Sequence, residues 1–386
     1  MVVRTEATVA SPSKPRVKKE ETSSIMRTFK RLQLNGGAAA SLHYTTPDVP
    51  PPPGLLNCRA LWTGEKNSAR PPIEAVCDLL DRMRELWVYK TSKGATKIIS
   101  MATSKTRIDI TESLLAHVRD SSGYKLLCLQ TSELQAVEVD SLGEAEKLVF
   151  FLNLHNLMAM HACLELGCPG PSLWRRFEWM SRATYSVGGH HLTMLEVEHC
   201  ILRARSNNPG GFIFAAFVLP RFAESDPRRK LCLEEPHPLL SFGATILAES
   251  SAPLRLFKSP DRVENDLRRA AEVYLGATVV ASASRKVVIL PALLMFFWSD
   301  FVPASMSRRE GLFEVCKLMP PGLRQRVEAV FFTPDSLEAY RAYRREHPEP
   351  EPRGSTGGAA ASPLRQKPRT WLRFDSYDWS PVLKLG

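Results

Sequence analysis

Residues 188–203, GGHHLTMLEVEHCILR, gather side chains that can bind metals or transfer protons. They include three histidines and two glutamates, His190, His191, His199, Glu196 and Glu198. Zinc sites need three or four ligands, often spaced as HxxxH or HExxH on one helix face. This stretch has neither spacing, since two of its histidines are adjacent and the third follows on the next element. The sequence therefore predicts no metal site, and no motif in it indicates a cofactor.

The same stretch predicts a helix that carries one inward-facing acid. Thr193 and Glu196 form a capping box, which is typical of a helix start. At about 100° per residue, Glu198 falls inside the sector of the apolar side chains. On the same wheel, His199 and Arg203 share a polar edge with Glu196. Glu198 is thus the residue of this stretch that most needs a partner.

A carboxylate on an apolar face must be neutralised or paired. Removing a lone carboxylate from water costs several kcal/mol, whether its role is structural or catalytic. The structural interpretation pairs Glu198 with Arg203, Arg255 or another arginine, and adds hydrogen bonds from buried asparagines. We favour this structural role of Glu198 over a catalytic one.

The longest apolar run, residues 148–166, predicts a helix at the centre of a domain. A capping box at Ser141 is expected to begin it, and Gly167 to end it. A membrane-spanning role is disfavoured because polar side chains interrupt the run. These are Asn153, His155, Asn156 and His161. Buried amides must be hydrogen-bonded, so Asn153 and Asn156, which share a helix face, are expected to hold neighbouring backbone or side chains.

The net charge of +10 does not indicate a nucleic-acid-binding domain. Residues 1–31 carry eight lysines and arginines against three glutamates, and residues 341–371 carry seven against three. The excess therefore sits in two tails, whose composition is more typical of solvated disorder than of phosphate recognition. We expect other proteins as partners and no specific nucleic-acid binding. The oligomeric state stays open.

Eight cysteines are scattered along the chain without a CxxC pair, which indicates reduced thiols inside a cell. The first thirty residues hold no apolar core of the signal-peptide type. A cytoplasmic location is predicted. Import into an organelle stays open, because the N-terminal residues are basic and contain several Ser and Thr.

The chain is predicted to fold as a mostly helical α+β domain with a central buried helix and a small sheet or hairpin, flanked by disordered basic arms. Residues 1–70 are assigned to a disordered or loosely docked arm, and residues 72–345 to the domain. Residues 346–369 are assigned to a disordered linker, because they are rich in Pro, Gly and Ala. Residues 370–386 are dense in aromatic side chains and are expected to return to the domain.

Three local predictions follow from patterns downstream of residue 235. The apolar run 238–247 favours a buried strand, and residues 278–281 and 286–290 favour a hairpin. A proline at position 291 is expected to begin an aromatic helix.

Several segments, in this order, resemble the domain-of-unknown-function 547 family. They are KLVFFLNLHNLMAMHACLELG, LTMLEVEHCILR, DPRRKLCLEEPHPLLSFG, ESSAPLR followed by VVILPALLMFFWSDF, and FDSYDWSP. The resemblance covers about residues 72–345 and 370–382. It implies a fold and a set of motif positions, but no activity, because none is established for the family. Those positions are Asn153, Asn156, His161, Glu198, His199, Arg203, Asp226, Arg228, Ser250, Ser251, Arg255, Tyr377, Asp378 and Trp379.

The first functional hypothesis is an interaction or scaffold module built around a buried polar network. Long tails, a nearly neutral domain and the lack of a cofactor motif favour it. The residues predicted to build its binding or structural network are Asn156, His161, Arg203, Arg255 and Asp378.

The alternative hypothesis is a hydrolase or transferase. Glu198 or His199 would act as the general base, and Ser250 or Ser251 as the nucleophile. The Ser251 position is, in bacterial relatives, often Cys, so this chain would need a base-activated serine. No GxSxG motif supports the serine. The candidate catalytic residues are Glu198, His199, Ser251 and Asn153, with the Asn156 amide and Arg255 as further oxyanion donors.

Overall fold

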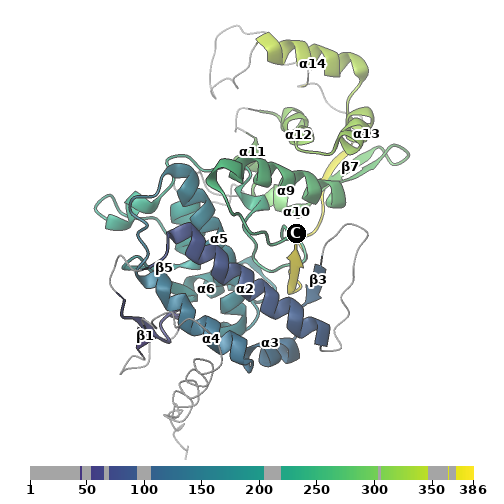
Figure 1. The fold of residues 1–386 in the computed structure, drawn as a ribbon. Coiled ribbons are helices and arrows are strands. Elements are labelled where there is room, and N and C mark those ends of the chain that lie inside the picture. Colours follow the sequence, from purple (N-terminus) through teal and green to yellow (C-terminus); the bar gives the residue numbers. More distant parts are fainter. Residues whose placement is uncertain are drawn as a thin grey trace, which may run out of the picture. The chain divides into compact units, whose positions relative to one another are not determined.

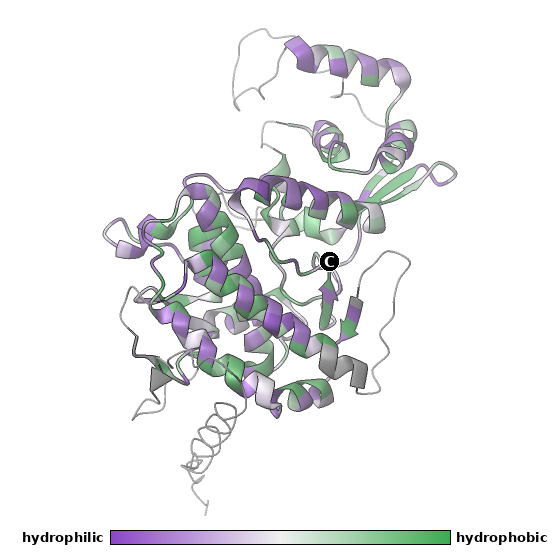
Figure 2. Ribbon diagram, viewed as in Figure 1, coloured by the Kyte–Doolittle hydropathy of each residue, from purple (hydrophilic) through white to green (hydrophobic). Residues whose placement is uncertain are grey.

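Helix α5 (Glu144–Leu166) forms the core of the computed structural model, and other elements pack around it (Figure 1). All of its side chains from residue 148 to residue 164 are buried. In Figure 2 its ribbon is coloured mainly as hydrophobic, whereas α14 (Pro334–Glu346), which has one buried side chain, is mainly hydrophilic. Such an all-round apolar helix is stable only inside a domain. The sequence-based prediction of a central buried helix is confirmed.

The structure describes residues 44–45, 54–64, 69–93, 106–203, 219–302, 306–346, 364 and 371–386. These residues belong to one unit, His43–Gly386. Most of the predicted N-terminal arm and of the predicted linker lies outside the described residues. Residues 54–64, which were assigned to the arm, pack on the domain. Asn57 in this segment donates a hydrogen bond to the Ser186 carbonyl (2.7 Å) and accepts one from the Ser186 amide (2.8 Å).

The start of α5 differs from the prediction by two residues. Gly143, not Ser141, is the residue before the first helical turn, and its amide donates to Glu146 Oε2 (2.9 Å). Glu146 stands three residues after Gly143, the spacing at which a side chain reaches back to the cap. Gly167 ends the helix with a φ of +79°, a conformation that favours glycine.

The first half of the domain is mainly helical, and several of its helices contact α5. Its helices are α2 (Pro72–Lys93), α3 (Glu112–Arg119), α4 (Ser122–Gln130), the 3-10 helix η2 (Thr131–Gln135), α6 (Leu173–Arg182), α7 (Met194–Glu196) and the π-helix η3 (Val197–Leu202). Side-chain caps begin several of them; Ser172, for example, accepts from the Arg175 amide (3.4 Å) at the start of α6.

The second half of the domain is also helical. Its elements are the 3-10 helices η5 (Pro227–Leu231), η6 (Leu240–Phe242) and η7 (Pro260–Arg262), and the helices α9 (Val263–Thr278), α10 (Ala292–Phe296), α11 (Trp298–Phe301), α12 (Arg308–Cys316), α13 (Pro321–Phe331) and α14. Pro291 begins α10 as predicted, but Phe297 leaves the helical conformation and separates α10 from α11.

The strands form small separate sheets. They are β1 (Tyr44–Thr45), β2 (Leu61–Trp62), β3 (Thr106–Asp109), β4 (Thr184–Val187), β5 (His190–Thr193), β6 (Val280–Ser282), β7 (Val287–Leu290), β8 (Trp371–Phe374) and β9 (Val382–Leu385). Antiparallel pairs join β1 to β2, β4 to β5 and β6 to β7, the last being the predicted hairpin. The C-terminal segment adds β8 parallel to β7 and β9 antiparallel to β3.

The prediction of a strand over residues 238–247 is wrong. This segment contains η6 and irregular backbone, and it is not a strand of any sheet among the described residues. At its end, the Leu247 carbonyl accepts a hydrogen bond from the Val382 amide of β9 (3.1 Å). The Asn156 amide takes the place of a strand partner. Its Nδ2 donates to the Gly243 carbonyl (3.0 Å), and its Oδ1 accepts from the Thr245 amide (3.0 Å). A short apolar run fits a buried loop as well as a buried strand when a side chain satisfies its backbone.

Asn153 holds a second loop in the same way. Its Nδ2 donates to the Phe257 carbonyl (2.6 Å), and its Oδ1 accepts from the Phe257 amide (3.0 Å). The two amides, one turn apart on α5, therefore fix two loops of the second half against the central helix. This is the local reason for the polar residues in an otherwise apolar helix.

The fold is α+β and mostly helical, as predicted. Among the described helices, α5 is long and apolar enough to cross a membrane, but 94% of its apolar window is buried inside the domain. Its apolar length is accounted for by its position in the core.

We expect Asn156→Ala to lower the free energy of unfolding by more than about 2 kcal/mol, because it leaves the Gly243 carbonyl and the Thr245 amide buried without partners. Urea unfolding followed by circular dichroism measures the change. Asn265→Ala, at an exposed position of α9, is the matched control and should stay within about 0.5 kcal/mol of the unaltered chain. Equal losses in the two variants would contradict this role for Asn156.

Candidate functional site

A cavity of about 500 Å³ opens beside α6, η3 and the C-terminal segment. Aromatic and aliphatic side chains make most of its wall, and a small number of charged and hydroxyl groups enter it. The apolar lining residues are Leu173, Trp174, Phe177, Met180, Ala244, Ile246, Leu293, Phe296, Phe297, Tyr377 and Trp379. The other lining residues are Arg176, Glu198, His199, Arg203, Ser241 and Ser251. We refer to this cavity as the aromatic pocket.

Helix α6 supplies one wall of the aromatic pocket. Leu173, Arg176, Phe177 and Met180 follow the i, i+3, i+4, i+7 spacing, so they lie on one helix face. Trp174 also lines the pocket and is 55% exposed, which places it at the rim.

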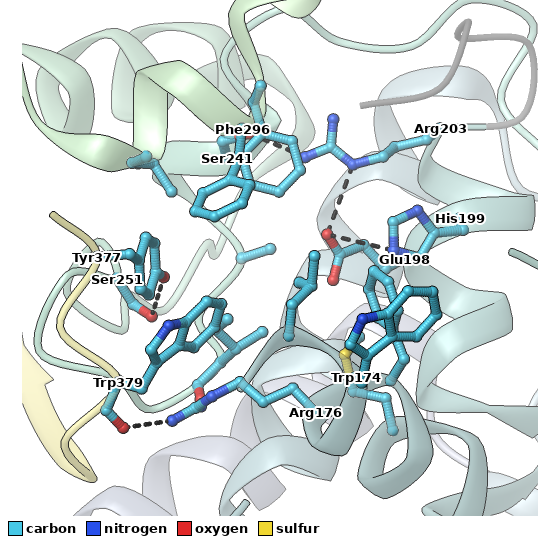
Figure 3. Close-up of a pocket in the computed structure, with 17 residues that line it drawn as sticks. Trp174, Arg176, Glu198, His199, Arg203, Ser241, Ser251, Phe296, Tyr377 and Trp379 are labelled. Atoms are coloured by element: carbon cyan, nitrogen blue, oxygen red, sulfur yellow. Dashed lines mark hydrogen bonds and ion pairs between the residues drawn. The ribbon is translucent and has the colours of Figure 1, made fainter. Parts of the chain in front are cut away.

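Segments distant in sequence complete the wall. Ser241 comes from η6, and Ala244, Ile246 and Ser251 come from the irregular backbone after it, which Asn156 holds at Gly243 and Thr245. Leu293 and Phe296 come from α10, and Phe297 follows it. Tyr377 and Trp379 come from the C-terminal segment. Figure 3 shows Ser251, Tyr377 and Trp379 on one side of the pocket and Glu198, His199 and Arg203 on the other.

The π-helix η3 determines how Glu198 and Arg203 meet. Glu198 lies within η3, and Arg203 is the residue at its C-terminal end. Arg203 stands five positions after Glu198, an i to i+5 spacing. An α-helix places side chains at this spacing about 140° apart around its axis, whereas i to i+5 hydrogen bonding brings them to the same side. Arg203 Nε accordingly lies 3.5 Å from Glu198 Oε1.

Three basic side chains surround the Glu198 carboxylate. In addition to Arg203, His155 Nε2 lies 3.2 Å from Oε2, and His199 Nε2 lies 4.0 Å from Oε1. Burial alone would raise the pKa of the Glu198 carboxyl, but His199, His155 and Arg203 hold it well below its usual range. Glu198 is therefore ionised. The prediction of an inward-facing, paired carboxylate with Arg203 as a partner matches this geometry, but Arg255 and the asparagines bind elsewhere.

Arg203 links Glu198 to the second half of the domain. It forms an ion pair with Asp300, and its Nη2 donates to Ser241 Oγ (2.8 Å). Its guanidinium carbon lies 4.3 Å from the centroid of the Phe297 ring. The side chain is 2% exposed, yet two carboxylates compensate its charge.

The prediction that Glu196, His199 and Arg203 share a polar edge is wrong. His199 and Arg203 have side chains only 5% and 2% exposed, and both line the aromatic pocket. Glu196 is separate from them; its Oε2 accepts from the Thr193 amide (2.9 Å) and its Oε1 pairs with Arg228 (3.0 Å). The helical wheel misplaced the edge because it assumed 100° per residue across a π-helix.

Ser251 lines the pocket but has no base beside it. Its Oγ accepts from the Ala248 amide (3.2 Å) and lies 3.3 Å from the Tyr377 hydroxyl. Burial raises the pKa of Tyr377 to about 12, so this hydroxyl stays protonated at neutral pH. Among the described residues, no hydrogen bond joins Ser251 to a histidine or a carboxylate.

The other candidate residues lie outside the aromatic pocket. Ser250 Oγ accepts from the Asp378 amide (2.9 Å), and the Asp378 carboxylate accepts from the Ser380 amide (2.9 Å). Ser250 and Asp378 therefore attach the C-terminal segment to the domain. Arg255 lines a separate polar cavity of about 220 Å³ together with Asp266. Asn153 and Asn156 bind backbone groups, as described above.

His161 belongs to a different polar cluster. Its Nε2 lies 3.7 Å from Cys128 Sγ, and its Nδ1 lies 2.6 Å from the Tyr185 hydroxyl. Cys128, His161 and Glu165 are the one group among the described residues whose potential metal-ligating atoms converge, within 4.8 Å. Glu165, however, already binds Arg59 and the Tyr124 hydroxyl. A cation here would meet the Arg59 guanidinium, so the geometry favours a hydrogen-bonded cluster over a metal centre.

Residues 139–275 match the model of a family described as protein of unknown function, DUF547. Over these residues the chain is similar to this family, and we refer to the domain that contains them as the DUF547 domain. The match includes α5, α6, η3 and most of α9, and with them Glu198, His199, Arg203 and Ser251. No curated protein and no solved structure gives a match. The wider extent of the resemblance, residues 72–345 and 370–382, stays a prediction, and so do its individual motif positions.

Arg176 is a charged pocket residue of the DUF547 domain that sequence reasoning missed. It is 1% exposed, although it is an arginine. The signal was present in LWRRFEWMSR, since Arg176 shares its helix face with Leu173, Phe177 and Met180. The argument that identified Glu198 as a charge on an apolar face applies to Arg176 as well.

We expect Glu198→Ala to destabilise the DUF547 domain by more than about 2 kcal/mol, because it leaves Arg203 and Asp300 in a buried network with altered charge. Thermal and urea unfolding measure the change. Glu178→Ala, at an exposed position of α6, is the control for losing a glutamate. A Glu198→Ala variant with the melting curve of the unaltered chain would exclude a stabilising network and would direct attention to function.

Two of the buried histidines, His161 and His199, predict that the DUF547 domain loses stability in acid. Burial lowers the pKa of His199 and of His161 to about 4, from 6.5. The unfolded chain therefore binds these protons at higher pH than the folded chain, and stability falls as the pH falls from about 6.5 to about 4. Each histidine contributes up to about 1.4 kcal/mol per pH unit in this window.

Urea unfolding between pH 7.5 and 5 tests this pH dependence. His199→Asn should reduce the slope of stability against pH, whereas His117→Asn, at an exposed position of α3, should leave it unchanged. Stability that is constant between pH 7 and pH 5 would show that these histidines are not buried in their neutral form.

Proposed function

We propose that the DUF547 domain is a non-catalytic binding module and that the aromatic pocket is its binding site. The volume of about 500 Å³ lies within the range of small-molecule sites, roughly 300–1,000 Å³. The wall is mainly aromatic and aliphatic, with few polar groups, which is the composition of sites that bind an apolar group and orient it.

The observation that carries this proposal is the environment of Ser251. A serine nucleophile requires a base within hydrogen-bonding reach. The hydroxyl contacts of Ser251 are a backbone amide and a protonated tyrosine. Glu198, the ionised acid of the pocket, is instead bound by His155, His199 and Arg203. Ser251 and Glu198 are thus occupied by contacts other than one with each other, and the apolar wall is left free for a ligand.

A hydrolase or transferase is the second candidate. One observation favours it: Glu198, His199 and Ser251 line the same pocket. His199 is neutral at pH 7 and could accept a proton. Figure 3 nevertheless separates Ser251 from both residues across the pocket. Release of 4-nitrophenol from a short-chain 4-nitrophenyl ester that is lost in Ser251→Ala would favour this candidate over a binding module.

The proposed binding role includes other proteins as partners and a cytoplasmic location. The exposed Trp174 at the rim supports a partner contact, since exposed aromatic side chains are frequent in interfaces. All eight cysteines are unpaired, as in proteins kept in a reducing compartment.

Nile red, a neutral apolar dye that becomes fluorescent on leaving water, tests whether the aromatic pocket binds ligands. We expect saturable binding to the unaltered chain. Ala244→Phe should abolish it by filling the pocket, and Ala277→Phe, at an exposed position of α9, should not. Ser251→Ala should bind the dye as the unaltered chain does. Dye binding that Ala244→Phe leaves unchanged would contradict the proposal.

A further inference from the structure

Arg176 carries a buried positive charge into the wall of the aromatic pocket. It projects from α6 and is 1% exposed. Buried arginines are usually paired with a carboxylate, because an isolated charge is strongly disfavoured away from water. The partners of Arg176 therefore indicate whether its charge is already compensated.

The contacts of Arg176 are all to uncharged groups. Nη1 donates to the Ile246 carbonyl, and Nη2 donates to the Trp379 carbonyl (2.7 Å). The guanidinium carbon lies 5.1 Å from the centroid of the Trp379 ring. Nε is buried and donates to none of the described residues. Within the described part of the chain, no aspartate or glutamate forms an ion pair with this side chain.

Among the described residues, none of the ionisable groups that act most strongly on Arg176 is a carboxylate. The ionisable groups that act on it are Tyr377, Cys163 and Cys168. Burial lowers the pKa of the Arg176 guanidinium, as expected where no acid offsets the loss of water. The other pocket arginine, Arg203, differs in this respect, since Asp300 and Glu198 compensate it.

The aromatic pocket thus has two electrostatically different sides. Arg203 is enclosed by acids on one side, whereas the charge of Arg176 on the other side has no counter-ion. Figure 3 shows Arg176 extending toward Trp379, away from the Glu198 cluster. A ligand anion that reached Arg176 would gain a buried charge-assisted contact, and its apolar part would meet the aromatic wall.

We infer that the aromatic pocket binds a monocarboxylate with an apolar body, the carboxylate lying at Arg176 and the body between the aromatic side chains. This inference rests on the proposed function and names the class of ligand. A monoanion matches the single charge of Arg176. A phosphate monoester carries about −1.5 to −2 at neutral pH, and ionised Glu198 in the same pocket would oppose the excess charge.

Displacement of Nile red from the unaltered chain compares ligands that share a ten-carbon body: decanoate, decanol, decyltrimethylammonium and decyl phosphate. Decanoate should bind at least tenfold more tightly than decanol, and decyltrimethylammonium more weakly than either. Decyl phosphate should bind less tightly than decanoate. Equal affinities for decanoate and decanol, or tighter binding of the phosphate, would overturn the inference while leaving the pocket a binding site. Failure of Nile red itself to bind would overturn the proposed function too.

Variants of Arg176 locate the anion. Arg176→Gln should lower the affinity for decanoate at least tenfold and change that for decanol less than threefold. Arg175→Gln, the same substitution at the neighbouring exposed position, should change neither. Because Arg176 also holds two carbonyls, Arg176→Lys provides a charged variant if Arg176→Gln does not fold, and it should keep the preference for decanoate over decanol. Loss of that preference in folded Arg176→Lys, or its retention in folded Arg176→Gln, would contradict the assignment.

Discussion

The pairing of Glu198 with Arg203 depends on a wider helical turn than the α-helix provides. Over Val197–Leu202 the chain forms a π-helix, and this places Arg203 over Glu198 and toward the second half of the domain. From there Arg203 reaches Asp300 in α11 and Ser241 in η6. Two distant segments are thereby joined to η3, and the Phe297 ring is set against the guanidinium as part of the pocket wall. The local turn and the shape of the pocket are consequences of the same ion pair.

This pairing also explains why the two sides of the pocket differ in how their charges are compensated. The charges of Glu198, Arg203 and Asp300 compensate one another, although Arg203 Nε and His155 Nδ1 form no hydrogen bond with the described residues. Arg176, on α6, is tied to two carbonyls and to an aromatic ring. Hydrogen bonds to carbonyls orient a guanidinium without neutralising it. A difference in compensation, and not the number of charged residues, therefore distinguishes the two sides.

Much of the fold could be predicted from the sequence, whereas less of the site could. The central helix, the capping box at Thr193 and the β6–β7 hairpin follow from local spacing, which acts through neighbours along the chain. The inward direction of Glu198 followed from the same spacing. The positions of His199 and Arg203 could not be predicted from this spacing, because a π-helix changes the angle between successive residues. The run at 238–247 was mistaken for a strand, because its partner is a side-chain amide on α5, about 85 residues earlier in the sequence.

The C-terminal segment shows what local patterns cannot supply. Its aromatic residues were expected to pack on the domain, but their place beside Ser251 depends on β8 pairing with β7 and β9 pairing with β3. The hydrogen bonds of Ser250 to the backbone of Asp378 then fix the residues on either side, Tyr377 and Trp379, in the pocket wall. The pocket is complete only while this segment is docked. Any ligand that contacts Trp379 must therefore also stabilise the docked segment, because binding favours the conformation that contains the site.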